Sequence, residues 1–525
     1  MSNTSHDRRI RLAFWILVIA GLIFRIGGAV GDRSLIHDEP LSLMAATGPL
    51  GVIAHWKAHG NPPIATWVPA QQWQNLLVIE ERWCLDRIRS DLLKYDIHPP
   101  LYFWSVHAWM CFFGSAAQTA RFFNALIAVL IAVTLVGAGR LWGLRTGPSL
   151  LVAGAWFIGP SALAISHEIR HYELMGLWAV GLIVAQGLVF QTPDSRKRAV
   201  GLCLTYLTVL LGILTHYHFA IFAAGVAVWA LCRRRPSTGH VGFLVGTAIG
   251  MGFISAWYVL GCPVELLDLG ALPSSIDAVD VGQLEKLRRT FWAWGNIIVP
   301  FRVLTLWNGV LGWILGFGFI AFSVWLVKTR ATQGPMQPLT FYFVWNVMWL
   351  TGLYLAGHSP GHAMGPKYLA CAWPVLFLLM GLRFQDGGFE ARRVIWVVLF
   401  VVVTGGFAKG SQDVYSRITA RPPAEAPSNV VVDTLIRGEF GRMVSSLDPE
   451  TRVFIAPKLW LFENYDVWRP AGNDDAVVFS SGRHQEDGSS WVDFGVVTGA
   501  VVESCSPSIQ VVPGFLCWSV AAGNQ

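Results

Sequence analysis

The sequence predicts an α-helical polytopic membrane protein with about 11 transmembrane helices, interfacial helices in a first external loop and a small C-terminal α/β soluble domain. Composition is the first reason: the 525 residues are 54% hydrophobic and only 14% charged, and the mean hydropathy is +0.48. The 25 Trp residues are the second, because Trp favours membrane interfaces. Basic residues stand in short clusters between apolar runs, which argues against a nucleic-acid partner.

The first apolar run begins after Arg8, Arg9 and Arg11 and ends near Val30. Because Lys and Arg collect on the cytoplasmic side, the N-terminus is expected to be cytoplasmic. No small-residue cleavage site followed by a soluble domain ends this run, so it is interpreted as an uncleaved anchor.

Later basic clusters fall at alternate ends of successive apolar runs, so one topology places them all inside. They are Arg140 with Arg145, residues 196–198 and 233–235, Lys328 with Arg330, and Arg383 with residues 392–393. This topology gives about 11 spans and places residues 31–120, 261–300, 358–368 and 409–525 outside.

Two external segments are too long to be turns. Residues 31–120 are rich in Trp and Pro and predict helices that lie in the interface, within a membrane module of residues 1–408. Residues 409–525 turn polar and then alternate in β-type runs, which predicts a soluble domain. Cys505 and Cys517 flank a predicted hairpin there, and whether they form a disulfide is open.

Acidic, imidazole and basic side chains gather at the external ends of the spans. A purely structural bundle has no need of them, because a charge at helix-centre depth costs roughly 2.5–3.5 kcal/mol. In chain order they are Asp38, Glu39, His98, Glu168, Arg170, Tyr172, His216, Lys367 and Tyr368. Their shared side of the membrane predicts a functional site.

One of these segments also matches the zinc motif H-E-x-x-H, at His167, Glu168 and His171. On a helix this spacing places two imidazoles one turn apart to hold zinc, with the Glu as general base. Against it, Arg170 adds a fixed cation, and the candidate third ligand Asp386 falls at the cytoplasmic end. An intramembrane zinc protease is therefore the alternative prediction.

The order and common side of the motifs resemble the GT-C glycosyltransferases that use polyprenyl-phosphate sugars, a superfamily that includes protein O-mannosyltransferases and the lipid A aminoarabinose transferase. The resemblance covers roughly residues 1–385. It implies that Asp38, with Glu39, supplies the catalytic base. It also implies that the later polar residues bind the lipid phosphate and sugar. They are His98, Glu168, Arg170, Tyr172, His216, Lys367 and Tyr368.

The sequence departs from the family pattern at two of these positions. His98 stands where some members have Lys before Pro-Pro, and Lys367 stands where many have Arg before Tyr-Leu.

The chemistry agrees with this assignment. Breaking a sugar–phosphate bond releases a monoester that carries more negative charge than the donor, so fixed cations such as Arg170 and Lys367 stabilise the transition state. His98 or His216 would be further hydrogen-bond donors to the leaving phosphate. A carboxylate takes the proton of the incoming hydroxyl, and direct attack inverts the anomeric centre.

The expected partners are a polyprenyl-phosphate-linked sugar, a lipid, glycan or protein acceptor, and membrane lipids. The assigned site contains no metal ligand and no cofactor is required, although a divalent metal is possible. The expected location is a bacterial inner membrane, with the site and the C-terminal domain extracytoplasmic. A transporter or flippase of a lipid-linked precursor is a further alternative, which the lack of an internal repeat disfavours. Asp38 also suits a helix N-cap, and Tyr172 and Tyr368 suit interface anchors.

Overall fold

The structure is a computed structural model. It describes residues 4–30, 35, 38–59, 63–96, 98–232, 287–288, 290–291, 294, 308–328, 336–356, 366–419, 427–433, 437–468, 476–481, 501–504 and 515–521. The chain divides into two compact units. The helical unit consists of Met1–Val30, His98–Tyr102 and Arg121–Tyr415, and the sheet unit consists of Gly31–Ile97, Phe103–Ala120 and Ser416–Gln525.

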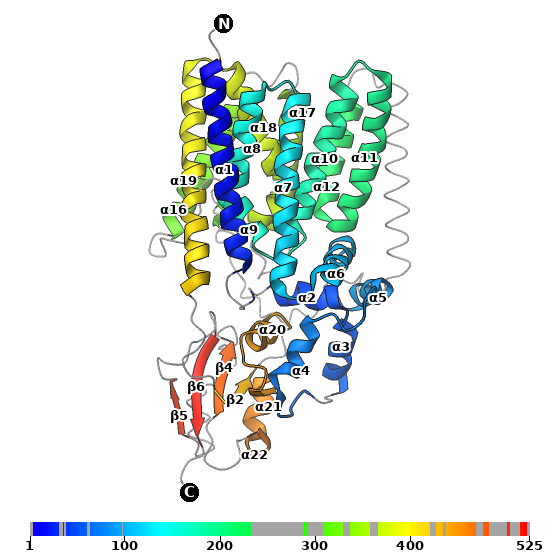
Figure 1. Ribbon diagram of the computed structural model, residues 1–525, viewed down its shortest axis with the longest axis vertical. Helices are drawn as coiled ribbons and strands as arrows, with labels where there is room; N and C mark the ends of the chain where they lie inside the picture. Colours follow the sequence, from blue (N-terminus) through cyan, green and yellow to red (C-terminus); the bar gives the residue numbers. More distant parts are fainter. Residues whose placement is uncertain are drawn as a thin grey trace. The chain divides into compact units, whose positions relative to one another are not determined.

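The helical unit is a bundle of long apolar helices (Figure 1). Its helices are α1 (Thr4–Val30), α7 (Ala117–Leu141), α8 (Thr146–Ile158), α9 (Pro160–Ser166), α10 (Tyr172–Gln191), α11 (Ser195–Thr215), α12 (His218–Cys232), α16 (Asn308–Lys328), α17 (Met336–Ala356), the 3-10 turn η3 (Pro366–Leu369), α18 (Ala372–Asp386) and α19 (Phe389–Thr419). Among the described residues, α1, α7, α10, α11 and α19 are long and apolar enough to cross a membrane. The pair α8 and α9, bent by 55°, makes a sixth if it counts as one span. The protein is therefore a polytopic helical membrane protein, and the expected total of about 11 spans remains a prediction.

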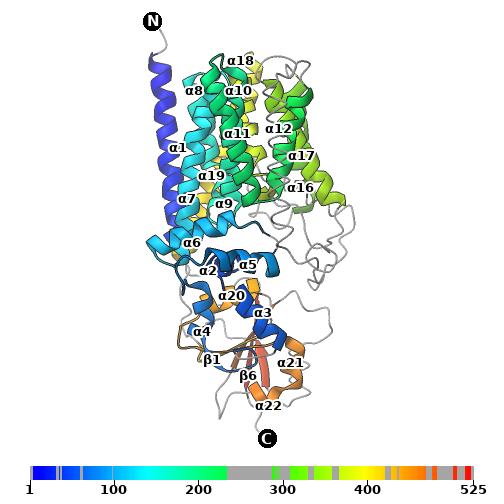
Figure 2. The same cartoon turned by 90° about the vertical axis from the view of Figure 1, so that its right-hand side faces the viewer.

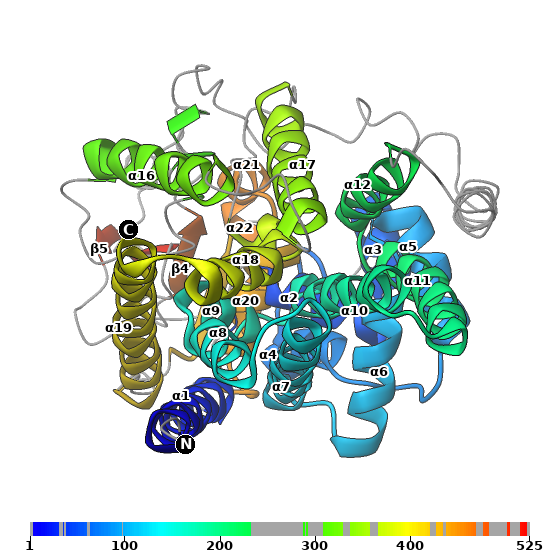
Figure 3. The same ribbon diagram turned by 90° about the horizontal axis from the view of Figure 1, so that it is seen from above.

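Packing within the bundle follows burial. The view down the helices shows α8 and α18 between α1 on one side and α17 on the other (Figure 3). Residues 372–382 of α18 are all buried, whereas α1 presents exposed apolar side chains such as Trp15 and Ile19. A helix that is apolar on all sides and buried belongs to the interior of a bundle, and one with an exposed apolar face suits contact with lipid.

The sheet unit joins short helices of the first long loop to a mixed sheet. The loop contributes α2 (Glu39–Thr47), α3 (Leu50–His59), β1 (Val68–Pro69), α4 (Ala70–Gln74), η1 (Asn75–Leu77), α5 (Leu85–Tyr95) and α6 (Leu101–Phe113). The C-terminal part contributes β2 (Asn429–Val432), α20 (Arg437–Ser445), β3 (Arg452–Ile455), α21 (Lys458–Glu463), α22 (Tyr465–Trp468), β4 (Ala476–Ser481), β5 (Val501–Ser504) and β6 (Phe515–Ala521).

The described strands form one sheet in the order β1-β3-β2-β4-β6-β5, with the short β1 at one edge (Figure 2). Strand β2 runs parallel to β3 and β4, and the other pairs are antiparallel. Val68 of β1 pairs with Val453 of β3. A strand from the first loop thus completes a sheet built by the C-terminal residues.

Both faces of this sheet are covered. Val431, Phe454 and Val478 pack in one core with Leu461 and Trp468 of α21 and α22. Successive side chains of a strand point to opposite faces, so Val430 and Val432 lie on the other face of the sheet. Both are fully buried, so this face is covered as well.

The unit boundaries differ from the predicted division into residues 1–408 and 409–525. Helix α19 continues unbroken to Thr419, and the first loop packs in the same unit as the C-terminal strands. The predicted helices of the first loop are present. The candidate disulfide lies outside the described residues, because Cys505 and the side chain of Cys517 are not among them.

Candidate active site

The central segment of the site is a turn between two helices. Helix α8 ends at Ile158, and Pro160 at the first position of α9 redirects the chain by 55°. Helix α9 ends at Ser166, α10 begins at Tyr172, and residues 167–171 form the turn between them. Because residues 167–171 are not helical, their side chains do not follow the periodicity of α9 or α10.

A buried amide holds this turn in place. Asn124 of α7 is fully buried, and its Nδ2 donates to the backbone oxygens of Glu168 and Arg170, the second at 3.3 Å. The hydroxyl of Tyr102 donates to Asn124 Oδ1 at 3.3 Å. Three segments of the helical unit are thus joined by one side chain.

Opposite charges and aromatic rings line the next layer. Lys367 Nζ, on η3, lies 3.8 Å from Glu168 Oε2 and 5.3 Å from the centre of the Tyr172 ring. The rings of Tyr172 and Tyr368 meet edge to face at 5.5 Å. The Lys367 cation is therefore held between a carboxylate and the ring of Tyr172, against which Tyr368 packs.

Imidazoles form the third layer. The ring centroids of His98 and His171 are 4.8 Å apart, and those of His171 and His216 are 4.3 Å apart. The ring of His218 lies 4.5 Å from that of His216 and 5.4 Å from that of Tyr368. Among the described residues, His98, His171 and His216 form the group with the geometry to hold a metal ion.

The buried rings are neutral at neutral pH. Burial lowers the pKa of His171 well below its usual 6.5, and the nearby His216, His98, Arg170 and Lys367 lower it further. Burial likewise lowers the pKa of His216 well below 6.5, assisted by His218, His98 and Arg170. Positive charge in this layer therefore comes from Arg170 and Lys367.

Most of the predicted site residues lie in this one region of the helical unit. They are His98, Glu168, Arg170, Tyr172, His216, Lys367 and Tyr368. The remaining two belong to the sheet unit. Asp38 is the N-cap residue of α2, yet its side chain makes no capping hydrogen bond, and Glu39 in the first turn of α2 is fully buried.

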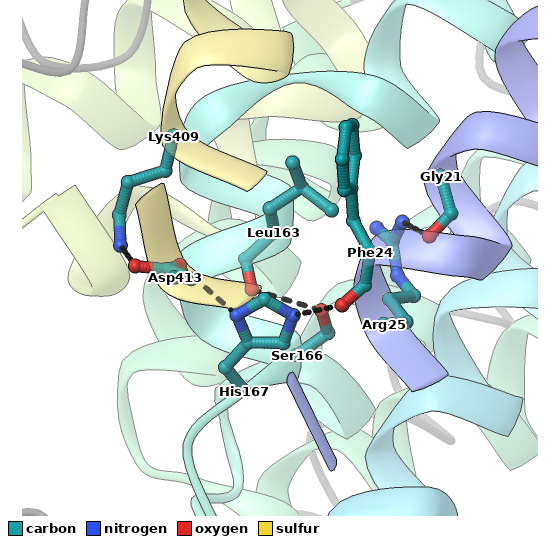
Figure 4. Close-up of polar contacts among 8 residues, drawn as sticks. All are labelled: Gly21, Phe24, Arg25, Leu163, Ser166, His167, Lys409 and Asp413. Atoms are coloured by element: carbon teal, nitrogen blue, oxygen red, sulfur yellow. Dashed lines mark hydrogen bonds and ion pairs between the residues drawn. The ribbon is translucent and has the colours of Figure 1, made fainter. Parts of the chain in front are cut away.

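The zinc-protease alternative fails on geometry. Its motif requires His167 and His171 on one helix face, but residues 167–171, all of which are described, form a turn instead of a helix. His167 Nδ1 lies 3.1 Å from Asp413 Oδ2, and His167 Nε2 lies 3.2 Å from the carbonyl oxygen of Phe24 (Figure 4). His171 packs instead against His98 and His216.

The partners of His167 also occupy both of its nitrogens. Nε2 faces the carbonyl oxygen of Phe24, and Nδ1 faces the carboxylate of Asp413, which already accepts from Lys409. Both nitrogens are thus used in contacts within the bundle and do not face His171. His167 thus ties α1 and α19 to the end of α9.

Two important residues were not predicted as part of this site. The sequence pattern assigns His171 only to a zinc motif on a helix, and it does not single out Asn124. An Asn in an apolar span is itself a signal, because a polar side chain at that depth needs a partner inside the bundle.

Comparison with known proteins finds solved structures of similar fold. No protein-family model matches the sequence, and no curated protein matches it. The crystal structure of ArnT from Cupriavidus metallidurans in the apo state aligns with a TM-score of 0.51 and 12% identity, over 99% of this chain and 100% of that one. The same protein bound to undecaprenyl phosphate aligns with a TM-score of 0.50 and 12% identity, over the full length of both chains.

A further similar structure is the oligosaccharyltransferase of Archaeoglobus fulgidus, with a TM-score of 0.43 and 12% identity over 85% of this chain and 65% of that one.

The fold and the membrane helices define a polytopic helical membrane protein whose overall fold is similar to that of ArnT. The likeness to ArnT extends over the sheet unit as well as the helical unit, since nearly the whole of both chains is aligned.

Proposed function

We propose that this protein is a glycosyltransferase that moves a hexosyl or pentosyl group from a polyprenyl-phosphate donor to a lipid, glycan or protein acceptor. The reaction takes place on the extracytoplasmic face of a bacterial inner membrane. The observation that carries the proposal is the joint position of Lys367, Arg170 and Glu168 at the ends of apolar helices. The full-length fold match to a protein that was solved with undecaprenyl phosphate supports it.

Lys367 and Arg170 would bind the donor phosphate. The lipid tail of the donor stays among the apolar helices while its phosphate and sugar remain at their ends, which is where these cations lie. Because the leaving phosphate gains charge as the sugar–phosphate bond breaks, fixed cations stabilise the transition state more than the ground state. Glu168 holds Lys367 by its ion pair until the phosphate arrives.

The aromatic and imidazole residues would complete the donor site. Tyr172 and Tyr368 offer ring faces and hydroxyls to the sugar, and His98 and His216 offer ring N–H groups. These roles are binding roles. Neutral rings and hydroxyls orient a sugar by hydrogen bonds without adding charge.

Asp38 would be the general base, with Glu39 as its supporting neighbour. The Asp38 carboxylate is half-buried at the N-cap position of α2, and a carboxylate is the type of group that takes the proton of an incoming hydroxyl. Glu39 is fully buried in the first turn of α2, which suits a positioning role. Direct attack of the acceptor hydroxyl predicts inversion at the anomeric carbon.

The test of donor binding uses undecaprenyl phosphate and the purified full chain in detergent. Loss of a charge-assisted hydrogen bond of about 1.5–3 kcal/mol predicts roughly 10- to 100-fold weaker binding in Lys367→Ala and in Arg170→Ala. Arg393→Ala is the matched control, because Arg393 is exposed near the start of α19. Equal affinity of all three variants and the parent protein would refute the proposed donor site.

A further inference from the structure

Three imidazoles of the helical unit converge from separate segments of the chain. His98 lies ahead of α6, His171 ends the turn before α10, and His216 follows α11. The closest two ring centroids, those of His171 and His216, are 4.3 Å apart, and the most distant, those of His98 and His216, are 6.0 Å apart. One nitrogen from each ring lies within 4.8 Å of the other two.

The second observation is the isolation of His171. Its side chain is fully buried, and neither Nδ1 nor Nε2 has a hydrogen-bond partner among the residues that the structure describes. An imidazole carries a donor and an acceptor, and nearly all buried polar groups of this kind are paired. A ring that faces two other imidazoles and has no partner of its own is suited to bind a ligand that accepts nitrogen lone pairs.

We propose that His98, His171 and His216 form a binding site for one divalent transition-metal ion of the zinc class. Zinc, cobalt and nickel accept imidazole nitrogen, whereas magnesium and calcium require oxygen ligands, which this triad lacks. Three protein ligands leave the fourth tetrahedral position open to water or to an oxygen of an anionic ligand. This assignment goes beyond the proposed transfer reaction, which requires no metal.

The site has room to close around an ion. Nitrogens that bind one zinc ion at about 2.0–2.1 Å are about 3.4 Å apart, so the rings must approach by roughly an ångström. His98 is half-buried, whereas His171 and His216 are buried, so His98 is the ring with the fewest neighbours to displace.

Two features of the surroundings bear on the choice of ligand atom and ion. His216 Nδ1 accepts the backbone N–H of His218 at 3.0 Å, so metal binding at either nitrogen of His216 gives up this one hydrogen bond. Lys367 is already paired with Glu168 at 3.8 Å, which reduces the repulsion between this cation and a metal ion. Arg170 is a second cation near His171 and His216, so the metal–nitrogen bonds must outweigh its repulsion of the ion.

The test measures metal binding by the purified full chain in detergent, after removal of metals with EDTA and without donor or acceptor. Titration with zinc is expected to give one ion per chain, and cobalt is expected to produce the visible absorption of a tetrahedral site. Magnesium at the same concentrations should not bind. His98→Gln and His171→Gln should each weaken zinc binding by more than the roughly 10- to 100-fold that the loss of an outer-shell partner costs.

His55→Gln is the matched control, because His55 is exposed on α3 of the other unit, and it should bind zinc as the parent protein does. The thermal midpoint of each metal-free variant reports its fold, and His98→Gln, at a half-buried position, decides the question if His171→Gln does not fold. Absence of saturable zinc binding, or unchanged binding in His98→Gln, overturns the proposal. Since no transfer is measured, failure of the proposed transferase activity leaves this result intact.

Discussion

At the scale of single residues, two neighbouring carboxylates have different surroundings. Asp38 sits at the N-cap of α2 with its side chain outside the cap, whereas Glu39 is fully buried one residue later. A base must reach an incoming hydroxyl, so the half-buried carboxylate is the better candidate. The buried one is better suited to hold the backbone of α2 in place.

Asp38→Asn is therefore expected to lower the rate of sugar transfer by about 10²- to 10⁴-fold, the usual contribution of a general base. The change is nearly isosteric, so expression and thermal midpoint should stay close to those of the parent protein. The measurement is single-turnover transfer from a polyprenyl-phosphate sugar at saturating donor.

Glu39→Gln is the comparison for this prediction and should reduce the rate less. If Asp38→Asn turns over almost normally and Glu39→Gln does not, the base is Glu39.

A second residue-scale prediction concerns His107 of α6. Its Nδ1 donates to the carbonyl oxygen of Ala46 at 2.8 Å, and its Nε2 accepts the backbone N–H of Trp83 at 3.1 Å. Burial lowers the pKa of His107 below its usual 6.5, although the bond to Ala46 acts in the opposite direction. Protonation would place a hydrogen on Nε2, which would then face the N–H of Trp83, so protonation of His107 is less favourable in the folded state.

The unfolded chain binds that proton below pH 6.5 and the folded chain does not, so this contribution to stability is lost as the pH falls below about 6.5. The loss should reach at most about 1.4 kcal/mol per pH unit. Unfolding midpoints between pH 8 and pH 5 should therefore fall less steeply in His107→Gln than in the parent protein. Parallel pH profiles would show that His107 does not cause the loss.

At the scale of elements, α2 is positioned by a helix from the far end of the chain. A Cβ added at Gly441 of α20 would lie 2.7 Å from Pro40 Cβ and 2.8 Å from Met44 Cε of α2. Such distances are too short for carbon contacts, and the Pro40 ring cannot turn away. Glycine at position 441 is thus required for the close approach of α20 to α2, the helix whose N-cap residue is Asp38.

Gly441→Ala should move α2 and cost about 1–3 kcal/mol through overpacking, partly offset by the higher helix propensity of Ala. If Asp38 is the base, the rate of transfer should fall while binding of undecaprenyl phosphate is retained. Gly352→Ala in α17 is the matched control, because an added Cβ there meets nothing within 4 Å. Equal rates in both variants would contradict the assigned role of this contact.

A second element-scale prediction concerns Asp413 of α19. Its carboxylate accepts hydrogen bonds from His167 and from Lys409, and His167 also bonds Phe24 of α1 (Figure 4). Asp413→Asn leaves two donors poorly paired, so unfolding should become easier by about 1–3 kcal/mol. Lys409→Met should cost less, because the His167 bond remains. A thermal midpoint of Asp413→Asn equal to that of the parent protein would show that this contact contributes nothing.

At the scale of the whole molecule, much of the fold could be predicted from the sequence. Long apolar runs with basic ends predict membrane helices because a chain in lipid must satisfy its own backbone. The pattern of residues 167–171 gave a wrong prediction, since H-E-x-x-H implies a helix. Nothing in the local sequence shows that one helix ends at Ser166 and the next begins only at Tyr172. The contacts of His167 with Asp413 and of Val68 with Val453 join distant segments, and no local pattern predicts them.

The pairing of the first loop with the C-terminal strands predicts the behaviour of a shortened chain. Trp67 Nε1 donates to the carbonyl of Trp468, and Gln74 Nε2 donates to the carbonyls of Val444 and Leu447. A chain that ends at Thr419 lacks all of these partners. Residues 63–77 should then be cut by protease much faster than in the full chain, while the membrane helices remain protected. Equal cleavage rates would mean that the loop holds its own structure.

The same pairing sets an order of events during synthesis. Trp67 and Trp468 are 401 positions apart in the chain, which at about 5–20 residues per second means that roughly 20–80 s pass between their syntheses. Helix α2, which follows Asp38, is packed against α20, so it cannot reach its final position until residues 437–445 have been made. A ribosome-bound nascent chain would have its first anchors in the membrane before its proposed base is in place, and catalytic competence would arrive only after α20 has been made.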